Sequence, residues 1–341
     1  MDQKRLLTKT LRWYRGKSVL VTGSSGYLGS KLIRLLAGVR CEIHCVDRLP
    51  EKRGPGDAAA SLHFHRVDIR KKNALAKLAT GADIIFHFAA QTSAQEADAD
   101  PAGDFQLNVL PLFNLLEACR AGGKRPIIVF ASTVTAYGVN PRLPVSEGQA
   151  DQPITIYDVH KVAAEKYLLN YCARGLARGA ALRLANVYGP GTSGKKDRGI
   201  FNRMVQRALA GEPLVVYGSG NFYRDYVYVD DVVRAFLLAP ANIRNVNGKA
   251  FIIGTGKGYT VKSVFREIAA LAGKRTGRPV RTLCKGADSA LHPADRRNFI
   301  ADPSGFMKAT GWKPEFPLRR GLEATMESFL SGRGGVPPAR K

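Results

Sequence analysis

The sequence predicts an α/β protein built on a doubly wound parallel sheet, with a smaller α/β region in its C-terminal part. Short β-rich segments alternate with helix-like segments over the first half of the 341 residues, as they do in consecutive β-α-β units. A glycine-rich turn directly follows the first of these strands. The alternation is lost after Leu184, which indicates a second region of different construction.

The expected strands are segments in which β-branched and other apolar residues are concentrated. They span residues 18–22, 42–46, 62–67, 83–88, 127–131 and 180–184. Helices are expected between them at 27–37, 71–79, 104–121 and 157–173. Helices cover both faces of such a parallel sheet, and ligands bind beyond the carboxyl ends of its strands.

The second half is less regular. Helices are expected at 200–210, 261–272, after Asp302 and at 319–330, with strands at 214–217 and 247–253 and a strand and helix within 226–238. We expect a first domain at 17–186 completed by 225–254, and a smaller substrate-binding region at 187–224 and 255–331. Residues 1–16 are expected to be a peripheral basic extension, and 332–341 a flexible tail.

Composition limits the class of protein. Hydrophobic residues make up 45% of the chain, yet no run approaches the ~20 apolar residues of a membrane span. The N-terminus lacks a signal-peptide pattern, so the expected location is cytoplasmic, with no membrane partner. The five cysteines are scattered, which favours reduced thiols. Cys41, His44 and Cys45 lack a second ligand pair at zinc-site spacing, so no metal is predicted.

The net charge of +24, from 52 basic and 28 acidic residues, is the unusual feature of the composition. The positive residues are spread over the N-terminal segment, residues 195–198, residues 274–281 and the tail. No zinc-finger, RNA-recognition or basic-zipper motif accompanies them. We therefore expect no specific nucleic-acid partner, and keep nucleic-acid binding as an alternative.

Gly23-x-x-Gly26-x-x-Gly29 lies between the first strand and the first helix. Gly23 permits the tight turn, Gly26 lets the backbone approach a pyrophosphate, and Gly29 allows close packing of helix on strand. The N-terminus of the helix favours the negative charge of the pyrophosphate. The pattern predicts a Rossmann-type dinucleotide site.

Further cofactor contacts are expected where the next strands end. Asp47 follows Gly29 by eighteen residues, where its carboxylate would accept hydrogen bonds from ribose hydroxyls and repel a 2′-phosphate. This favours NAD over NADP, although Arg48 and Arg53 lie nearby. Asp68-Ile69 ends the third strand and is placed to contact adenine. The small residues of His87-Phe88-Ala89-Ala90 would let a cofactor lie against the backbone.

Tyr157 and Lys161 are four residues apart in a helix-forming segment and so share one helix face. An ammonium group close to a phenol favours the phenolate. Such a tyrosine can take a proton from a hydroxyl at neutral pH. The spacing alone is common on solvated helices.

These motifs, with Asn108 and Ser132-Thr133-Val134-Thr135-Ala136-Tyr137-Gly138, resemble the extended short-chain dehydrogenase/reductases. Within them the chain is similar to the NAD-dependent nucleotide-sugar epimerase/dehydratase family, which includes UDP-glucose 4-epimerases. The resemblance spans about residues 17–330. It implies NAD contacts from Gly23, Ser25, Gly26, Tyr27, Leu28, Gly29, Asp47, Arg48, Asp68, Ile69, Phe88, Ala89, Ala90, Asn108, Tyr157 and Lys161.

The resemblance also implies a catalytic triad. Thr133 would hydrogen-bond the reacting sugar oxygen, Tyr157 would move its proton, and Lys161 would orient the nicotinamide ribose while a hydride moves between sugar and nicotinamide. Asn186 and Arg224 match residues that bind the substrate diphosphate. Tyr217 matches an aromatic ring presented to the nucleotide base. The alternative for Arg224 is a surface ion pair with Asp225.

Two departures narrow the expected reaction. Val134 and Thr135 follow Thr133 where related dehydratases and UDP-glucuronate decarboxylases carry carboxylates, which disfavours dehydration and decarboxylation. The Arg-x-Gly-Asp element of many 4-epimerases corresponds to His292-Pro293-Ala294-Asp295 here. A phosphate-binding arginine is therefore missing at its usual place, and His292, Arg296 or Arg297 could substitute for it.

The leading hypothesis is an NAD-dependent epimerase of a nucleoside-diphosphate sugar, acting at C4 through a transient 4-keto sugar. UDP is the expected nucleotide, with TDP, GDP and CDP as alternatives. A nucleotide-sugar dehydrogenase or 4-ketoreductase using NAD(P) is the alternative enzyme, and a non-catalytic NAD- or nucleic-acid-binding protein the alternative of another class. The resemblance further implies a homodimer in which 104–121 and 157–173 form a four-helix bundle with their symmetry mates.

Overall fold

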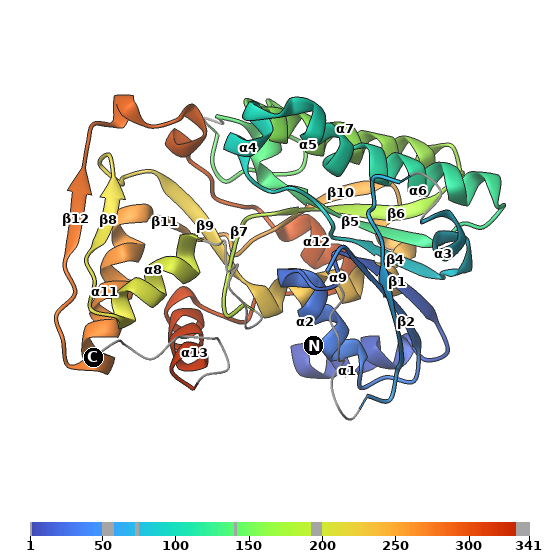
Figure 1. The fold of residues 1–341 in the computed structure, drawn as a ribbon, viewed down its shortest axis with the longest axis horizontal. Helices are drawn as coiled ribbons and strands as arrows, with labels where there is room; N and C mark the ends of the chain where they lie inside the picture. The colour runs from blue at the N-terminus through green and yellow to red at the C-terminus, as the bar shows by residue number, and fades with distance from the viewer. Residues whose placement is uncertain (1, 50–57, 72–74, 140–141, 192–199, 332–341) are drawn as a thin grey trace.

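A parallel sheet of seven strands forms the centre of the computed structural model, which describes residues 2–49, 58–71, 75–139, 142–191 and 200–331. The strand order is β3-β2-β1-β4-β5-β6-β10 (Figure 1). The strands are β1 (Ser18–Thr22), β2 (Glu42–Asp47), β3 (Ser61–Arg66), β4 (Ile84–His87), β5 (Ile127–Thr133), β6 (Arg178–Leu184) and β10 (Lys249–Ile253). The predicted doubly wound parallel sheet is confirmed.

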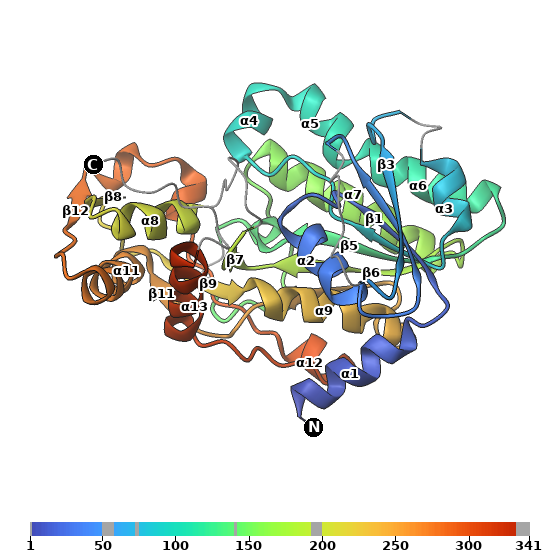
Figure 2. The same cartoon turned by 60° about the horizontal axis from the view of Figure 1, so that its bottom comes forward.

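Helices cover both faces of this sheet (Figures 1 and 2). On one side lie α1 (Gln3–Trp13), α2 (Tyr27–Leu36) and α9 (Val229–Ala241). The other side carries α3 (Ala76–Gly81), α5 (Pro101–Asn108), α6 (Leu110–Ala121) and α7 (Ile156–Ala173). The short α4 (Ala94–Ala99) precedes α5.

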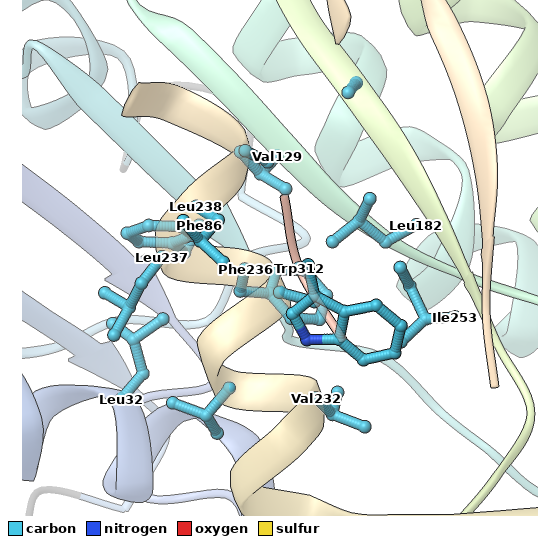
Figure 3. Packing of buried hydrophobic residues seen from close by; sticks show 14 of the residues in the cluster. Leu32, Phe86, Val129, Leu182, Val232, Phe236, Leu237, Leu238, Ile253 and Trp312 are labelled. Carbon is cyan, nitrogen blue, oxygen red and sulfur yellow. The ribbon is translucent and has the colours of Figure 1, made fainter. Parts of the chain in front are cut away.

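Alternation along the strands divides the buried side chains between two cores. In β1, Val19 and Val21 belong to the core under α2 and α9, whereas Leu20 belongs to the core under α3 and α6. Successive strand residues point to opposite faces, so a strand buried on both sides is apolar throughout. Trp312 lies within the first core (Figure 3). It packs against Phe306 and donates from its indole nitrogen to the Asp231 carbonyl at 2.9 Å.

A second, smaller assembly follows β6. Its three-stranded sheet has the order β11 (Gly258–Thr260), β9 (Tyr223–Tyr228), β7 (Asn186–Tyr188), and β8 (Leu214–Tyr217) pairs in parallel with β12 (Thr282–Lys285). Around them lie α8 (Ile200–Leu209), α11 (Val261–Thr276) and α13 (Leu318–Leu330), on a separate core (Figure 1). The short α12 (Ser304–Thr310) contacts β10, and the short α10 (Ile243–Val246) contacts β6 and α12. The predicted domain boundaries stay a prediction. β10 belongs to the main sheet and α9 packs on that sheet, whereas β9 belongs to the smaller one.

Two expected elements differ from the structure. The helix expected at 104–121 is divided at Val109 into α5 and α6, where Pro111 lies in the first turn of α6 and supplies no backbone N–H to the preceding helix. The helix expected at 71–79 begins at Ala76; residues 72–74, like the predicted tail at 332–341 and the basic cluster at 195–198, lie outside the described residues.

The expectation that residues 1–16 are peripheral is wrong for α1. Tyr14, just after this helix, is fully buried and donates its hydroxyl to the Leu237 carbonyl at 2.8 Å. Gln3 donates to the Gly311 carbonyl at 2.9 Å. Leu6 and Thr10 are buried on the same side, at the i, i+4 spacing that directs one helix face to a core. The basic residues occupy the opposite, exposed face.

A buried ionic network attaches α7 to the sheet. Arg183 on β6 binds Glu165 on α7 with Nη2 to Oε1 at 2.5 Å, and Asp151 with Nη1 to Oδ1 at 2.7 Å. Ser132 on β5 donates to the second oxygen of Glu165 at 2.7 Å. Glu165 is fully buried and Arg183 is 3% exposed. A buried charge requires such pairing, because loss of one partner leaves an uncompensated ion.

We expect Glu165→Gln to lower the free energy of unfolding by about 3–5 kcal/mol, because Arg183 then loses its main buried counterion. Urea denaturation followed by circular dichroism measures the change. Glu323→Gln, which removes the exposed carboxylate paired with Arg319 on α13, is the control and should cost about 0–1 kcal/mol. Equal effects of the two substitutions would contradict the assigned role of the network.

Candidate active site

A cavity of about 780 Å³ lies at the carboxyl ends of the central strands. Its walls come from the loops after β1, β2, β3 and β4 on one side and from β7 and α8 on the other. The lining residues include Gly23, Gly26, Tyr27, Leu28, Asp47, Arg48, Ile69, Phe88, Ala89 and Ala90 from the predicted cofactor set. This is the edge of the sheet at which doubly wound folds bind ligands.

The glycine turn is shaped by close backbone contacts. Gly23 has a φ of 69°, and a Cβ added to it would lie 2.7 Å from the amide nitrogen of Ala89. A Cβ on Gly29 would lie 2.3 Å from the carbonyl oxygen of Gly23. Gly26 is the N-cap of α2 and supplies no side-chain cap. The positive end of the α2 dipole therefore lies beside the turn, where it favours an anion such as a diphosphate.

Asp47 connects the ends of β1 and β2. Its Oδ2 accepts from the amide of Ser25 at 3.0 Å and its Oδ1 from the amide of Leu49 at 3.2 Å. The Ser25 hydroxyl donates to the Leu49 carbonyl at 2.8 Å. These bonds hold the carboxylate at the cavity wall, where it retains lone pairs for ribose hydroxyls.

Asp68 and Ile69, which follow β3, have different surroundings. Arg70 binds the Asp68 carboxylate through Nε and Nη2, and this hydrogen-bonded pair lowers the pKa of Asp68 to about 2. Ile69 lines the cavity. Asp68 is thus engaged by Arg70, while Ile69 presents an apolar surface that suits adenine.

His87 and Asn108 support the cavity wall from behind. Thr22 Oγ1 lies 2.9 Å from His87 Nδ1, and burial, aided by Lys161, lowers the pKa of His87 to about 3. Asn108 donates from Nδ2 to the Gln91 carbonyl at 3.1 Å and to Asp104 Oδ1 at 2.8 Å. Asn108 is 1% exposed. It holds the segment after β4 in place, and its contact with a cofactor stays a prediction.

Thr133 and Tyr157 come together at the same edge of the sheet. Thr133 ends β5, where its Oγ1 lies 2.9 Å from Thr135 Oγ1, and Tyr157 lies in the first turn of α7, close enough for the Thr133 hydroxyl to influence its pKa. A capping box of Thr155 and Asp158 fixes the start of α7. Lys161 lies one turn further on, 3% exposed, with Nζ 4.1 Å from the centroid of the Phe130 ring.

The pKa values of Tyr157 and Lys161 differ from the sequence-based expectation. Burial raises the pKa of Tyr157, and the charges of Asp158 and Asp104 raise it further. The Thr133 hydroxyl and the charge of Arg297 oppose this rise. Burial also lowers the pKa of Lys161 to about 7, against the charges of Asp104 and Glu165. The expected net lowering of the Tyr157 pKa is therefore wrong, because desolvation outweighs the nearby positive charge.

The predicted substrate residues lie in the smaller assembly. Asn186 is exposed at the start of β7, and Tyr217 is 68% exposed at the end of β8. Arg224 on β9 donates from Nη1 to the Arg297 carbonyl and from Nη2 to the Asp295 carbonyl. The alternative of a surface pair between Arg224 and Asp225 is wrong, since Asp225 is fully buried. Its oxygens accept from Thr255, Gly256 and Ala301.

His292 caps the short 3-10 turn at Pro293–Arg296. Its Nδ1 accepts from the amide of Ala294 at 3.2 Å, and its Nε2 lies 3.7 Å from Asp98 Oδ2. Arg296 is exposed. Arg297 donates to the Thr135 carbonyl at 3.1 Å and to Asp158 Oδ2 at 3.3 Å. Of the two arginines considered as phosphate ligands, Arg297 is thus held by the segments that carry Thr133 and Tyr157.

Sequence reasoning missed several residues of the site. Gln91, Thr92, Glu96, Leu107, Phe201 and Asn202 also line the cavity. Phe201 and Asn202 are in a helix with an ordinary amphipathic pattern, so nothing local distinguished them. Asp104, which bonds His160 Nδ1 at 2.7 Å as well as Asn108, was hidden in the same way within a predicted helix.

The described residues contain neither a metal-type cluster nor a membrane-spanning helix. No group of three or more His, Cys, Asp and Glu side chains there is arranged to hold a metal ion. No helix in the same part of the chain has the length and apolar character needed to cross a membrane.

Comparison with known proteins places the chain. The model of the NAD-dependent epimerase/dehydratase family matches residues 19–254. A UDP-glucose 4-epimerase of Mycolicibacterium smegmatis is 32% identical over 91% of this chain and 97% of its own length. The crystal structure of a Thermotoga maritima UDP-glucose 4-epimerase with UDP-glucose has a TM-score of 0.80 at 31% identity, and the match covers 92% of this chain and 99% of that one. The structure of a Thermus thermophilus UDP-glucose 4-epimerase in complex with NAD has a TM-score of 0.77 at 30% identity, and the match covers 94% of this chain and 100% of that one. The chain therefore belongs to the NAD-dependent epimerase/dehydratase family.

Proposed function

We propose that this protein is an NAD-dependent epimerase that inverts C4 of a nucleoside-diphosphate sugar, with UDP as the nucleotide. The observation that carries the proposal is the pair formed by Thr133, at the end of β5, and Tyr157, in the first turn of α7. It lies at the carboxyl edge of a sheet whose glycine turn, Asp47 and apolar walls suit a dinucleotide. The relatives that act on UDP-glucose at C4 support the choice of position and nucleotide.

The residues of the cavity fit NAD. Its volume lies within the range of about 300–1,000 Å³ typical of ligand sites. The glycine turn and the N-terminus of α2 would hold the diphosphate, Asp47 the adenosine ribose and Ile69 the adenine. When bound, NAD supplies a reversible hydride acceptor. Asp47 would disfavour an added 2′-phosphate.

The chain's own groups would handle the proton and the substrate orientation. Thr133 would donate to the sugar oxygen and fix it beside Tyr157. Tyr157 would take the hydroxyl proton as the C4 ketone forms and return it when the ketone is reduced from its other face. Val134 and Thr135 offer no carboxylate beside Thr133, which supports epimerisation over loss of water. Arg224 would bind the diphosphate, and Tyr217 would stack on the base.

We also propose a homodimer through α5, α6 and α7. These helices lie along one side of the molecule (Figure 1). Phe105, Val159 and Tyr167 are 44%, 44% and 43% exposed on them, and Phe113 packs edge-on against Tyr167 at 5.3 Å. Large apolar side chains gathered on one face are typical of an interface, and a two-fold axis would pair this face with itself.

Tyr157→Phe should reduce kcat by about 10²–10⁴-fold, because it removes the group that moves the proton. Bound NAD, measured after denaturing the protein, should be unchanged. Tyr171→Phe, on the same helix but bonded to Glu117, is the matched control and should retain activity. Full turnover by Tyr157→Phe would exclude the role given to Tyr157.

The purified wild-type protein should contain NAD and convert a UDP-sugar to its C4 epimer without added cofactor, since the substrate is oxidised and reduced in one cycle. NMR of UDP-, TDP-, GDP- and CDP-sugars measures both the stereochemistry and the nucleotide preference. Stoichiometric consumption of NAD(P)H with a 4-keto sugar would instead identify a ketoreductase.

Tyr167→Lys should shift the protein from dimer to monomer at micromolar concentration, because a charge would be buried in the proposed interface. Sedimentation velocity measures the mass. Leu283→Lys on β12, where Leu283 is 42% exposed, is the control and should leave the dimer intact. A wild-type monomer would refute this part of the proposal.

A further inference from the structure

Arg297 contacts both segments that carry the proposed proton-transfer groups. Its Nη1 donates to the carbonyl of Thr135, two residues after Thr133, and to Oδ2 of Asp158, the residue next to Tyr157. The Arg297 side chain is 11% exposed and that of Asp158 is fully buried. One guanidinium thus joins the end of β5 to the first turn of α7.

The backbone that carries Arg297 is itself fixed. Arg297 Nε donates to the Ala294 carbonyl at 3.0 Å, which closes the turn on itself. Arg224 reaches the same turn and donates to the carbonyls of Asp295 and Arg297. Arg297 therefore reaches Asp158 from a turn that is held by its own side chain and by that of Arg224.

Asp158 makes this contact necessary. Its Oδ2 accepts from the amides of Ile154 and Thr155 at 3.4 and 3.3 Å, whereas its Oδ1 is buried without a hydrogen-bond partner in the described part of the chain. A buried carboxylate beside a phenol opposes loss of the phenol's proton. Among the described residues, Arg297 is the cation that forms an ion pair with Asp158, and it so offsets the negative charge of that carboxylate.

The other charged groups around Tyr157 do not perform this task. Asp104 on α5 adds negative charge and is bonded to His160 and Asn108. Lys161 on α7 is held over the Phe130 ring, where burial disfavours its charged form. Arg297 is the cation whose contacts lie on the residue adjoining Tyr157 and on the segment after Thr133.

We propose that Arg297 is a positioning residue for Tyr157: it fixes the start of α7 against the end of β5 and neutralises Asp158, so that Tyr157 can release a proton. The inference rests on the proposed function and assigns Arg297 to the proton-transfer step, in place of the phosphate-binding role considered from its place in the sequence shortly after His292. The effect on proton release requires a buried, paired Asp158, which the structure shows.

The test uses three variants of the NAD-loaded protein: Arg297→Gln, Asp158→Asn and the two combined. Two quantities are measured against pH: the ultraviolet absorbance of the Tyr157 phenolate, with Tyr157→Phe subtracted, and kcat for C4 inversion. Arg297→Gln should move the ionisation of Tyr157 upward by about 1 pH unit, and Asp158→Asn should move it downward. The double variant should lie between them, because both charges are then gone.

A purely structural role gives a different result. Both single variants would then lose stability and kcat with no opposed movement of the pH dependence, and that outcome would overturn the proposal. If Arg297→Gln does not fold, Asp158→Asn still decides, since an unmoved or raised ionisation of Tyr157 also counts against it. Arg297→Lys keeps a positive charge at this position, so the ionisation of Tyr157 in this variant should lie between those of the wild type and of Arg297→Gln.

Arg275→Gln, which breaks an exposed pair with Glu327, is the control for removal of one arginine and should leave both pH profiles in place. The absorbance titration needs no substrate, so it separates the two proposals. A wild-type protein that inverts no nucleotide sugar would refute the proposed function, whereas the order of the three phenolate titrations would still accept or reject Arg297 as the positioning residue.

Discussion

The geometry of the site depends on the buried ionic bond between Arg183 and Glu165. Tyr157, Lys161 and Glu165 are spaced by four residues along α7, so they lie on one face of the helix, toward the sheet. Glu165 is bound by Arg183 on β6 and by Ser132 on β5, and Ser132 directly precedes Thr133. The network therefore sets both the rotation of α7 and its height above β5. Because the paired charges are buried, slipping by one turn would separate them, and this restricts α7 to a single position.

Burial has a cost for the chemistry at the same place. It raises the pKa of Tyr157 and lowers that of Lys161 to about 7, so both groups resist their charged forms. The neighbouring charges act unequally: Asp104 supports a charged Lys161 and opposes a charged Tyr157. A cation that acts on Tyr157 without being attached to α7 is therefore useful, and Arg297 meets this requirement. Because the site is buried, its effective dielectric constant is low, and each such charge has a larger effect than it would in water.

The local parts of this architecture were predictable from the sequence. The glycine turn and the strands at 18–22 and 42–46 are specified by short-range patterns, since a tight turn needs its glycines and a buried strand its concentration of apolar residues. The contacts that complete the site are not local. Arg297 and Asp158 are 139 residues apart in the chain, and no local pattern in either segment indicates contact with the other. The depth of Tyr157 is likewise a tertiary property, which is why spacing to Lys161 alone gave the wrong direction for its pKa. The packing of one face of α1 against the rest of the protein was missed because the basic residues of its exposed face obscured the buried one.

The placement of Arg224 connects substrate binding to proton transfer. Its guanidinium donates to two carbonyls of the turn that ends at Arg297, whereas the proposed function has it bind a diphosphate. A guanidinium carries five N–H groups in a planar fork, so it can bind phosphate oxygens on one edge while keeping bonds to carbonyls on the other. A diphosphate seated in this way would hold the turn through Arg224, and the turn holds Arg297 against Asp158. Substrate that lacks the diphosphate would then bind beside a less restrained Arg297, so the energy of binding the nucleotide, far from the reacting carbon, would contribute to the orientation of Tyr157.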